Sequence, residues 1–383
     1  MTTKTVANIN QYSGSSVNPL EHPEQLYELY SVPSFETGYP EIVKGKDIGS
    51  TKITVEEGDV LVCKINPRIN RVWVVKHNTE YPLLASSEWI VVRNKNIDSN
   101  YLKWYFSSPT FRTLLNSQVA GIGGSLTRAQ PKQVAKYSVP VPSRSEQQQV
   151  SENLDKVNEL IALRKEQLAK LDQLVKSRFI ELFGDPIVNP KNWEKMKLVD
   201  VCTKLTDGTH FSPESYPEGE YRYVTAKNIK IDGFDFSNIT YVPKSVHDEI
   251  YARCNPEYGD VLYIKDGVTT GIAMVNTLHE PFTMLSSVAL LKQNRKLLEG
   301  AYLCGVLNNQ NMYDAIRKDM GGAAITRLTI VKLKNIQIPV PPLELQTQFA
   351  TFVEQTDKSK LVIQQSLDKL ETLKKSLMQE YFG

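Results

Sequence analysis

The chain has 383 residues, of which 41% are hydrophobic and 23% charged, and its formal net charge is +2. This length predicts two or three globular domains, and the near-neutral charge excludes a strongly basic nucleic-acid-binding tail. Any contact with a polyanion must therefore use local basic patches. No apolar run approaches the roughly 20 residues of a membrane span, and the polar N-terminus is unlike a signal peptide, so we expect a cytoplasmic protein.

The first globular part, expected at 1–144, is rich in short strand patterns. Runs of β-branched and aromatic residues predict strands at 59–62, 71–75 and 89–92. A helix is predicted at 99–117. A Gly-rich loop at 121–128 and a strand at 137–142 follow. The composition of these segments predicts a mixed α/β domain.

A second globular part, expected at 185–343, repeats this order. Three short motifs recur at a constant offset: Thr127-Arg128, Pro140-Val141-Pro142 and Phe183-Gly184 return as Thr326-Arg327, Pro339-Val340-Pro341 and Phe382-Gly383. A Gly-Asp pair before a strand also recurs, at 58–59 and 259–260. The chain is therefore two tandem units of one architecture.

Each globular part is followed by a long helical pattern, at 145–184 and 344–383. Apolar residues repeat there in steps of four and three, which is typical of a coiled coil. A helix of about 36 residues spans about 54 Å, and the chain order favours an antiparallel pair related by a pseudo-two-fold axis. The alternative is that each helix packs only on its own globular part.

Basic residues gather where acids are absent. No Asp or Glu occurs at 99–145 or at 60–79, and the stretch 320–343 of the second copy is also free of acids. An acid-free basic surface suits a polyanion, because phosphate contacts release counterions. The alternative is chance clustering on a solvated face.

The Gly-rich loops are the first candidate binding segments. Glycine backbone N–H groups and small hydroxyls can approach phosphate oxygens closely. The candidate residues are Ser125, Thr127 and Arg128 in the first copy and Thr326 and Arg327 in the second. The alternative is a tight turn without a ligand.

The segments after the Gly-Asp strands are the second candidate. Arg can pair with guanine and Asn with adenine, and the two copies differ in side-chain chemistry here. The candidates are Lys64, Asn66, Arg68, Asn70 and Arg71 in the first copy, Lys265, Asp266, Thr269 and Thr270 in the second, and, with weaker support, Thr209, His210, Lys227 and Asn228. A polar loop with no ligand is the alternative.

No catalytic or metal-binding pattern is evident. The four cysteines form no Cys-x-x-Cys pair and the five histidines are dispersed, so we expect reduced cysteines and no metal. Asp207 and His210 could form an acid–base pair, but no nucleophile accompanies them. We therefore expect no catalytic residue.

Together these features resemble the specificity (S) subunit of type I restriction–modification enzymes. The resemblance is carried by the Gly-Asp-Val-Leu strands at 58–61 and 259–262, Asn-Pro-Arg-Ile-Asn-Arg at 66–71, Asn192-Trp193, Asp207-Gly208-Thr209-His210, the Thr-Arg loops, and the Pro-Val-Pro hinges before Gln-rich helix starts. The first copy has no counterpart of Asn192-Trp193.

The resemblance implies an α+β fold with two target recognition domains, at 1–144 and 185–343, and two spacer helices, at 145–184 and 344–383. Such a subunit binds double-stranded DNA at an asymmetric site in two parts, and docks two methyltransferase (modification) subunits beside restriction/translocase subunits. It is not catalytic and binds no cofactor itself; S-adenosylmethionine, ATP and Mg are expected on the partner subunits. Two other classes remain open: a coiled-coil scaffold with two ligand-binding ends and no DNA role, and the recognition part of a stand-alone methyltransferase.

Overall fold

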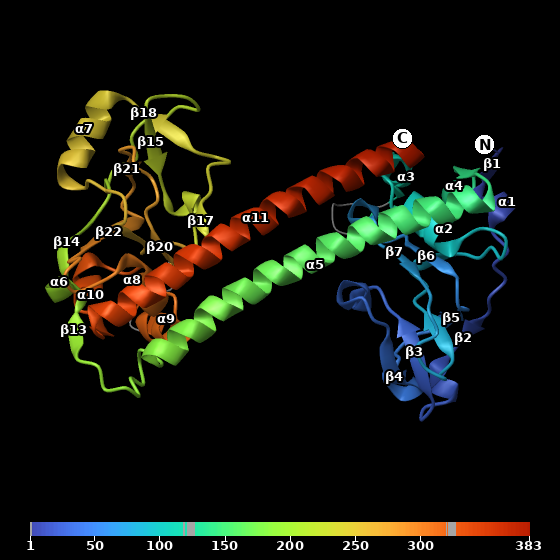
Figure 1. Ribbon diagram of the computed structural model, residues 1–383. Coiled ribbons are helices and arrows are strands. Elements are labelled where there is room, and N and C mark those ends of the chain that lie inside the picture. Colours follow the sequence, from blue (N-terminus) through green and yellow to red (C-terminus); the bar gives the residue numbers. More distant parts are fainter. Residues whose placement is uncertain (1, 118, 121–126, 319, 321–326) are drawn as a thin grey trace. The chain divides into compact units, whose positions relative to one another are not determined.

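The computed structural model describes residues 2–117, 119–120, 127–318, 320 and 327–383 (Figure 1). The chain divides into two compact units. The first unit consists of Met1–Lys165 and Gln365–Gly383, and the second of Glu166–Gln364. Each long helix therefore contributes one part to each unit. The boundaries expected from the sequence, at 144, 184 and 343, remain a prediction.

The core of the first unit is an antiparallel sheet of three strands, in the order β7 (Val72–Val74), β6 (Val60–Cys63) and β9 (Trp89–Val92). The central strand β6 is apolar throughout and almost completely buried, as expected of a strand covered on both faces. The strands predicted at 59–62, 71–75 and 89–92 are thus confirmed.

Two helices, α2 (Ser99–Phe106) and α3 (Pro109–Ser117), pack on this sheet. A single helix at 99–117 was expected, and that prediction was wrong. The Asp98 side chain caps α2 by accepting from the Tyr101 N–H. Proline disfavours helical backbone in the residue before it, and the helix is interrupted at Ser107 and Ser108, directly before Pro109.

A second sheet of the first unit escaped the sequence analysis. Its order is β2 (Ser16–Val17), β5 (Lys52–Thr54), β8 (Leu83–Ala85), β3 (Leu26–Tyr30) and β4 (Glu41–Lys44), with β3 and β8 parallel. Most of these strands are too short to show an alternating pattern. In β3 the pattern is further masked by Glu28, which is buried and accepts hydrogen bonds from Asn78 and Thr79. The 3₁₀ turns η1 (Pro19–Glu21), η2 (Pro33–Thr37) and η3 (Gly45–Asp47) lie between these strands, and η4 (Pro67–Ile69) lies between β6 and β7 of the first sheet.

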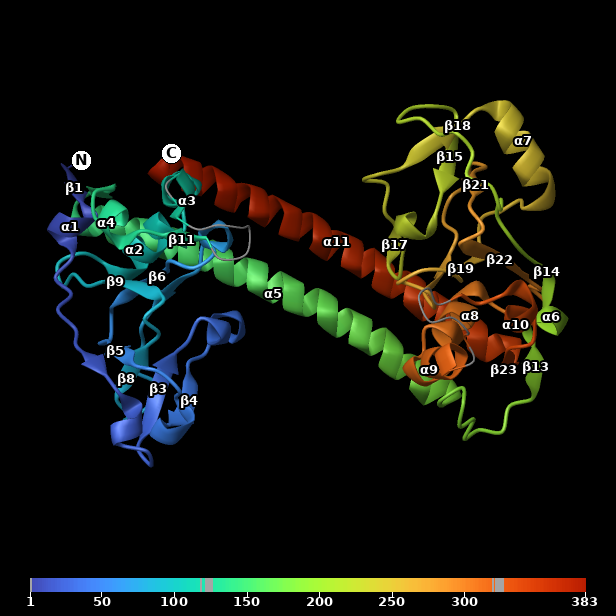
Figure 2. The ribbon, with the colours of Figure 1, turned by 180° about the vertical axis from the view of Figure 1, so that it is seen from behind.

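The second unit contains an antiparallel sheet in the order β14 (Cys202–Asp207), β22 (Val288–Gln293), β19 (Val261–Ile264) and β20 (Ala273–Val275). Helices α8 (Gly300–Leu307), α9 (Gln310–Lys318) and α10 (Ile330–Lys334) gather beside it (Figure 2). A smaller sheet, β18 (Thr240–Val242), β15 (Tyr221–Val224) and β21 (Thr283–Met284), lies next to α7 (Lys244–Arg253). The turn η5 (Ala226–Asn228) leads into the hairpin of β16 (Ile229–Lys230) and β17 (Gly233–Phe234).

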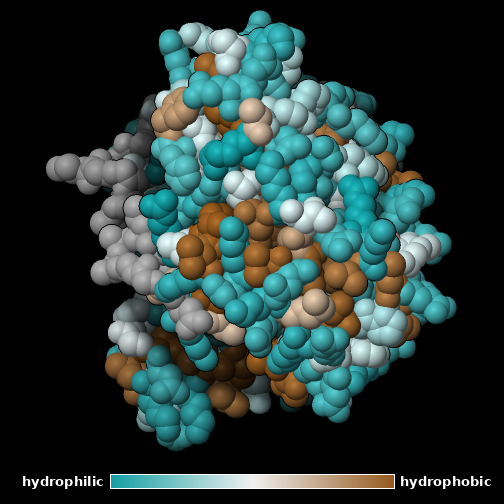
Figure 3. Space-filling model, turned by 90° about the vertical axis from the view of Figure 1, so that its left-hand side faces the viewer, coloured by the Kyte–Doolittle hydropathy of each residue, from teal (hydrophilic) through white to brown (hydrophobic). Residues whose placement is uncertain are grey.

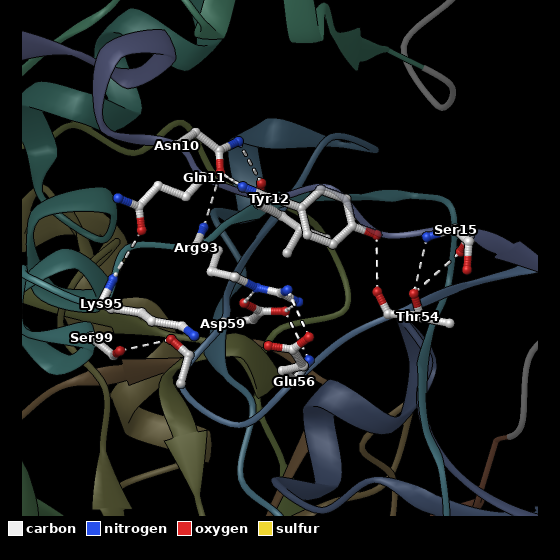
Figure 4. Close-up of polar contacts among 12 residues, drawn as sticks. Asn10, Gln11, Tyr12, Ser15, Thr54, Glu56, Asp59, Arg93, Lys95 and Ser99 are labelled. Atoms are coloured by element: carbon white, nitrogen blue, oxygen red, sulfur yellow. Dashed lines mark hydrogen bonds and ion pairs between the residues drawn. The ribbon is translucent and has the colours of Figure 1, made fainter.

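The Gly-Asp pair of the first unit anchors its central strand. Gly58 has φ +88°, a conformation that favours glycine, and Asp59 is 1% exposed. The Asp59 carboxylate accepts two hydrogen bonds of 2.7 Å from the Arg93 guanidinium and one of 2.9 Å from the Glu56 N–H (Figure 4). The motif therefore joins the start of β6 to the end of β9.

The second unit repeats this anchor with a different cation. Gly259 has φ +85°, and the Asp260 carboxylate accepts from the Glu257 N–H at 2.8 Å. Lys292 occupies the position equivalent to Arg93, because each directly follows the residue that pairs with the first residue of the central strand. Lys292 pairs with Asp260 at 2.9 Å. The Gly-Asp motif is thus a structural anchor in both units.

Each unit also opens in the same way. In the first, β1 (Thr2–Thr5) pairs with β12 (Ser138–Val141) and leads into the one-turn helix α1 (Val6–Ile9). In the second, β13 (Lys195–Lys197) pairs with β23 (Gln337–Pro339) and leads into α6 (Leu198–Val201). The first copy therefore has a structural counterpart of the segment that follows Asn192-Trp193, although the motif itself is missing. The Trp193 indole N–H donates to the Phe183 carbonyl and so ties this segment to the end of the long helix before it.

The long helices are α5 (Arg144–Phe183) and α11 (Leu343–Phe382). In the first unit, Asn153 bonds Tyr381 at 2.9 Å and Lys165 pairs with Glu371 at 3.1 Å. In the second unit, Asp172 pairs with Lys360 at 2.6 Å, and the rings of Phe179 and Phe349 lie 5.5 Å apart. Residue numbers rise along α5 as they fall along α11, so the helices run antiparallel within each unit.

The outer ends of these helices belong to the globular cores. Val150 and Leu154 of α5 and Phe382 of α11 are buried in the core cluster of the first unit. Phe179 and Phe349 are buried in that of the second. The helices therefore pack on each other and on the globular parts, which combines the two alternatives left open by the sequence.

Candidate nucleic-acid interface

The two segments after the Gly-Asp strands, loops 64–71 and 265–271, have the same backbone frame. In loop 64–71, Asn66 and Asn70 have φ +47° and +48° and flank the turn η4. In loop 265–271, Gly267 and Gly271 have φ +103° and +113°. Most residues avoid this left-handed region, whereas glycine and asparagine tolerate it. The tip of each loop, 67–69 or 268–270, thus lies between two residues with a left-handed backbone conformation.

Each loop is joined to the Thr-Arg segment of its own unit. Strand-like bridges link Ile65 to Arg128 and Asp266 to Arg327. The Lys64 carbonyl accepts from Ala129 at 2.8 Å, and the Lys265 carbonyl accepts from Leu328 at 2.9 Å. The two candidate segments of each copy therefore form one surface, which the sequence could not show. Two members of the predicted set, Ser125 and Thr326, lie outside the described residues.

In the first unit, two of the candidate arginine side chains pair with carboxylates. Arg128 is about half exposed and bonds Glu88 at 3.1 and 3.3 Å. Arg71 is less exposed and bonds Glu36 at 3.1 Å. Exposed ion pairs contribute only about 0–1 kcal/mol, so Arg128 can exchange its carboxylate for a phosphate at little cost. Lys64 and Thr127 are half-buried beside it.

The asparagines of loop 64–71 act through their backbone. The Oδ1 atoms of Asn66 and Asn70 are buried and have no hydrogen-bond partner in the described part of the chain, so they do not face a ligand in this conformation. The exposed residues of this loop are instead Arg68 and Ile69.

In the second unit, the candidate residues surround a buried carboxylate. Lys265 is 1% exposed, and its ammonium pairs with Asp266 at 2.9 Å and Asp207 at 3.4 Å. The expectation that Lys265 faces DNA is therefore wrong for this conformation. A buried ammonium must keep its carboxylates, because the charge is costly to leave unpaired.

Three further basic side chains contact the same pair of carboxylates. His210 and Arg253 contact Asp207 at 3.2 and 3.4 Å, and Arg327 contacts Asp266 at 3.4 Å. The side chains of His210 and Arg327 are 60% and 56% exposed. Asp207 and Arg253 were not among the predicted site residues. The turn motif that contains Asp207 was noticed, but its use as a charge centre depends on α7, which brings Arg253.

The Asp-Gly-Thr-His turn is packed too tightly for a larger residue at Gly208, where a Cβ would lie 2.0 Å from the Met284 carbonyl oxygen. Thr209 is buried, and its backbone bonds Met284 and Ser286 at 2.8 Å each. The turn therefore places His210 at the surface, while Thr209 holds the turn against the neighbouring segment.

Two other predicted contacts are also internal. Asn228 is buried, accepts from the Thr225 N–H at 3.0 Å and donates to the Asp235 carbonyl. Thr270 is buried and donates to the Gly267 carbonyl at 2.6 Å. Their side chains stabilise turns and are not available to a ligand, whereas Lys227 and Thr269 are exposed.

Other chemistry finds little support in the described ranges. They contain no cluster of three His, Cys, Asp or Glu side chains arranged to hold a metal, and none of their helices is long and apolar enough to cross a membrane. The four cysteines are free. Burial raises the pKa of the Cys202 and Cys254 thiols to about 12, so these thiols stay protonated and unreactive near neutral pH.

Comparison with known proteins gives this surface its context. The family described as "Type I restriction modification DNA specificity domain" matches residues 27–173 and 190–372, one match for each copy of the repeat. The chain belongs to this family. Its role is that of a DNA specificity subunit and not of a catalytic one, as the sequence predicted.

Curated relatives agree with this assignment. The type I restriction enzyme MjaVIII specificity subunit of Methanocaldococcus jannaschii is 22% identical over 351 residues, covering 86% of this chain and 80% of the relative. The putative MjaX specificity subunit of the same organism is 22% identical over 352 residues, covering 89% and 81%.

Solved structures share the fold of this specificity subunit. The S subunit of a type I restriction–modification system from M. genitalium has a TM-score of 0.59 at 13% identity, covering all of this chain and 96% of the other. A chain from a study of complex assembly and conformational transition of the type I R-M system also scores 0.59, at 19% identity, covering all of this chain and 97% of the other.

Proposed function

We propose that this specificity subunit reads a DNA site in two unlike parts, with loop 64–71 and its Thr-Arg segment on one half-site and loop 265–271 with its own on the other. One observation carries the proposal: both units build the same loop frame on the same strand bridge, yet expose different side chains. Loop 64–71 exposes Arg68 and Ile69, and loop 265–271 exposes Val268 and Thr269. A constant frame with variable tips supports two different base sequences.

The exposed basic side chains around each loop support contact with the phosphate backbone. Arg128 in the first unit, and His210 and Arg327 in the second, lie on carboxylates that compete with phosphate. Phosphate contacts position a protein on DNA, while contacts to base edges select the sequence. Carboxylates that hold these side chains in the free protein would weaken binding to random DNA without removing the side chains from the interface.

The long helices would form a spacer between the two half-sites. Their antiparallel contacts in each unit support a coiled coil with a pseudo-two-fold axis, on which two methyltransferase (modification) subunits would dock in equivalent ways. Restriction/translocase subunits would complete the assembly. In this proposal S-adenosylmethionine, ATP and Mg belong to those partners, and this chain supplies recognition alone.

Arg128 offers a direct test of the interface, with Arg144 as its matched control. Both side chains are 52% exposed and both are ion-paired. In the complex with modification subunits, Arg128→Ala is expected to weaken DNA binding about tenfold and to reduce the salt slope of binding by about one. Titrations of labelled duplex at several salt concentrations measure both quantities.

Arg144→Ala should leave affinity and salt slope unchanged. Equal losses in both variants would show that general charge is being measured and not a contact of the Thr-Arg segment. If wild-type affinity responds to neither salt nor sequence, the chain acts as a scaffold without a DNA role, and the proposal fails.

A further inference from the structure

Val268 occupies an unusual position for an apolar residue. Its side chain is 95% exposed, more than any other large apolar side chain in the described ranges, where the next is Tyr39 at 76%. Single exposed apolar residues are common, and Figure 3 shows a face of the molecule on which many apolar side chains gather. Exposure alone therefore does not mark Val268 as a binding residue, whereas its position in the loop does.

The loop that presents Val268 is held from both sides. The Thr270 hydroxyl donates to the Gly267 carbonyl, and the Gly271 N–H donates to the Ile264 carbonyl at 2.8 Å. A Cβ at Gly271 would lie 2.3 Å from the Tyr313 ring, so the loop packs closely on α9. Val268 thus stands at the tip of a fixed turn, and little conformational entropy is lost when it meets a ligand.

The same arrangement occurs in the other unit. Loop 64–71 also exposes two residues between its left-handed positions, and one of them is again β-branched and apolar: Ile69, at 54% exposure. The exposed pairs, Arg68-Ile69 and Val268-Thr269, are shifted by one place within the common frame. Two loops of unlike sequence therefore each combine one polar and one apolar tip residue.

The neighbouring charges restrict the kind of ligand that can bind beside Val268. Asp266 in the same loop holds Arg327, and its buried partner Lys265 links it to Asp207 and His210. A ligand that suits exposed cations and also offers a small apolar group is the major groove of DNA, where thymine presents its 5-methyl group. Apolar side chains that wedge between base steps, namely Phe, Leu, Ile, Met and Pro, do so from the minor groove, whereas the thymine methyl group lies in the major groove.

We infer that Val268 contacts the 5-methyl group of a thymine in the half-site read by the second unit, and that Ile69 does so in the half-site read by the first. Both residues are then specificity-determining, each beside a polar partner on the same tip. The inference rests on the proposed function, because it requires that these loops face DNA.

The test uses the specificity subunit in complex with its modification subunits and a duplex that contains the methylated site. Each thymine of the second half-site is replaced in turn by uracil, which lacks only the methyl group. One replacement is expected to weaken wild-type binding about four- to tenfold. The Val268→Ala variant should bind the thymine duplex more weakly than the wild type by a similar factor. Uracil at the sensitive position should then weaken its binding no further.

Val188→Ala is the matched control, since Val188 is an apolar residue of the same unit at 71% exposure; it should bind both duplexes like the wild type. The inference is overturned if the uracil effect persists undiminished in Val268→Ala, if no thymine in the half-site is sensitive, or if Val268→Ala impairs assembly with the modification subunits and not DNA binding. In all three cases the wild type still prefers its site, which separates this failure from failure of the proposed function. Ile69→Ala with uracil in the first half-site repeats the test independently.

Discussion

Replacing Asp207 with alanine is expected to destabilise the second unit by about 3 kcal/mol, because it removes one of two carboxylates from a buried ammonium. Lys265, at 1% exposure, would keep only Asp266, and His210 and Arg253 would lose their shared anchor. Binding to the second half-site should fall with this loss, while the first half-site is still bound. Urea unfolding and competition with single half-site duplexes measure the two effects.

Two further variants sharpen this prediction. Combining Asp207→Ala with Lys265→Met removes the buried charge together with its partner and should restore most of the stability. Asp248→Ala breaks an exposed ion pair with Lys244 and should cost less than about 1 kcal/mol. A double variant no more stable than Asp207→Ala alone would show that the buried lysine is not the source of the loss.

Inserting one heptad into both α5 and α11 is expected to move the two half-sites apart. Seven helical residues add about 10.5 Å, or about three base pairs of DNA. Placing the insertions after Lys165 and after Gln364, where the chain divides between the units, keeps both cores intact. Affinity for the original site should fall by a factor on the order of 1,000, toward that for random DNA.

The recovery of affinity is the decisive part of this experiment. A duplex with the same half-sites and about three more base pairs between them should bind the lengthened protein nearly as well as the original pair bound. An insertion in α5 alone would shift one helix against the other and should bind neither duplex. If the protein with both insertions still requires the original number of base pairs between the half-sites, the helices do not act as a spacer.

Much of this fold follows from local sequence. Strand β6 is apolar from Val60 to Cys63, and the apolar repeat of the long helices is sustained over many turns, so both were predictable. The sheet that contains β3 was missed because its strands are short and Glu28 is buried in its centre with hydrogen-bond partners from a distant loop. Tertiary contacts of this kind leave no periodic signal.

The sequence likewise indicated part of the candidate site and missed the rest. The sequence singled out the loops after both Gly-Asp strands and the Thr-Arg segments, and in each unit the two segments do meet; their contact with DNA stays a prediction. It could not tell which side chains face outward, because polar residue type does not report burial. Lys265, Thr270 and Asn228 are polar yet internal, whereas Val268 is apolar yet 95% exposed. Burial here depends on tertiary contacts, such as the ion pairs of Lys265 with Asp207 and Asp266.

Sequencing methylated adenines in cells that express the chain with its modification subunits will show whether this chain selects a DNA site in two unlike parts. We expect a single motif of two different half-sites separated by a fixed number of unread base pairs, absent when this chain is omitted. Val268→Ala should relax the motif in one half only. A continuous motif, or methylation that is the same without this chain, would mean that the chain does not select such a site.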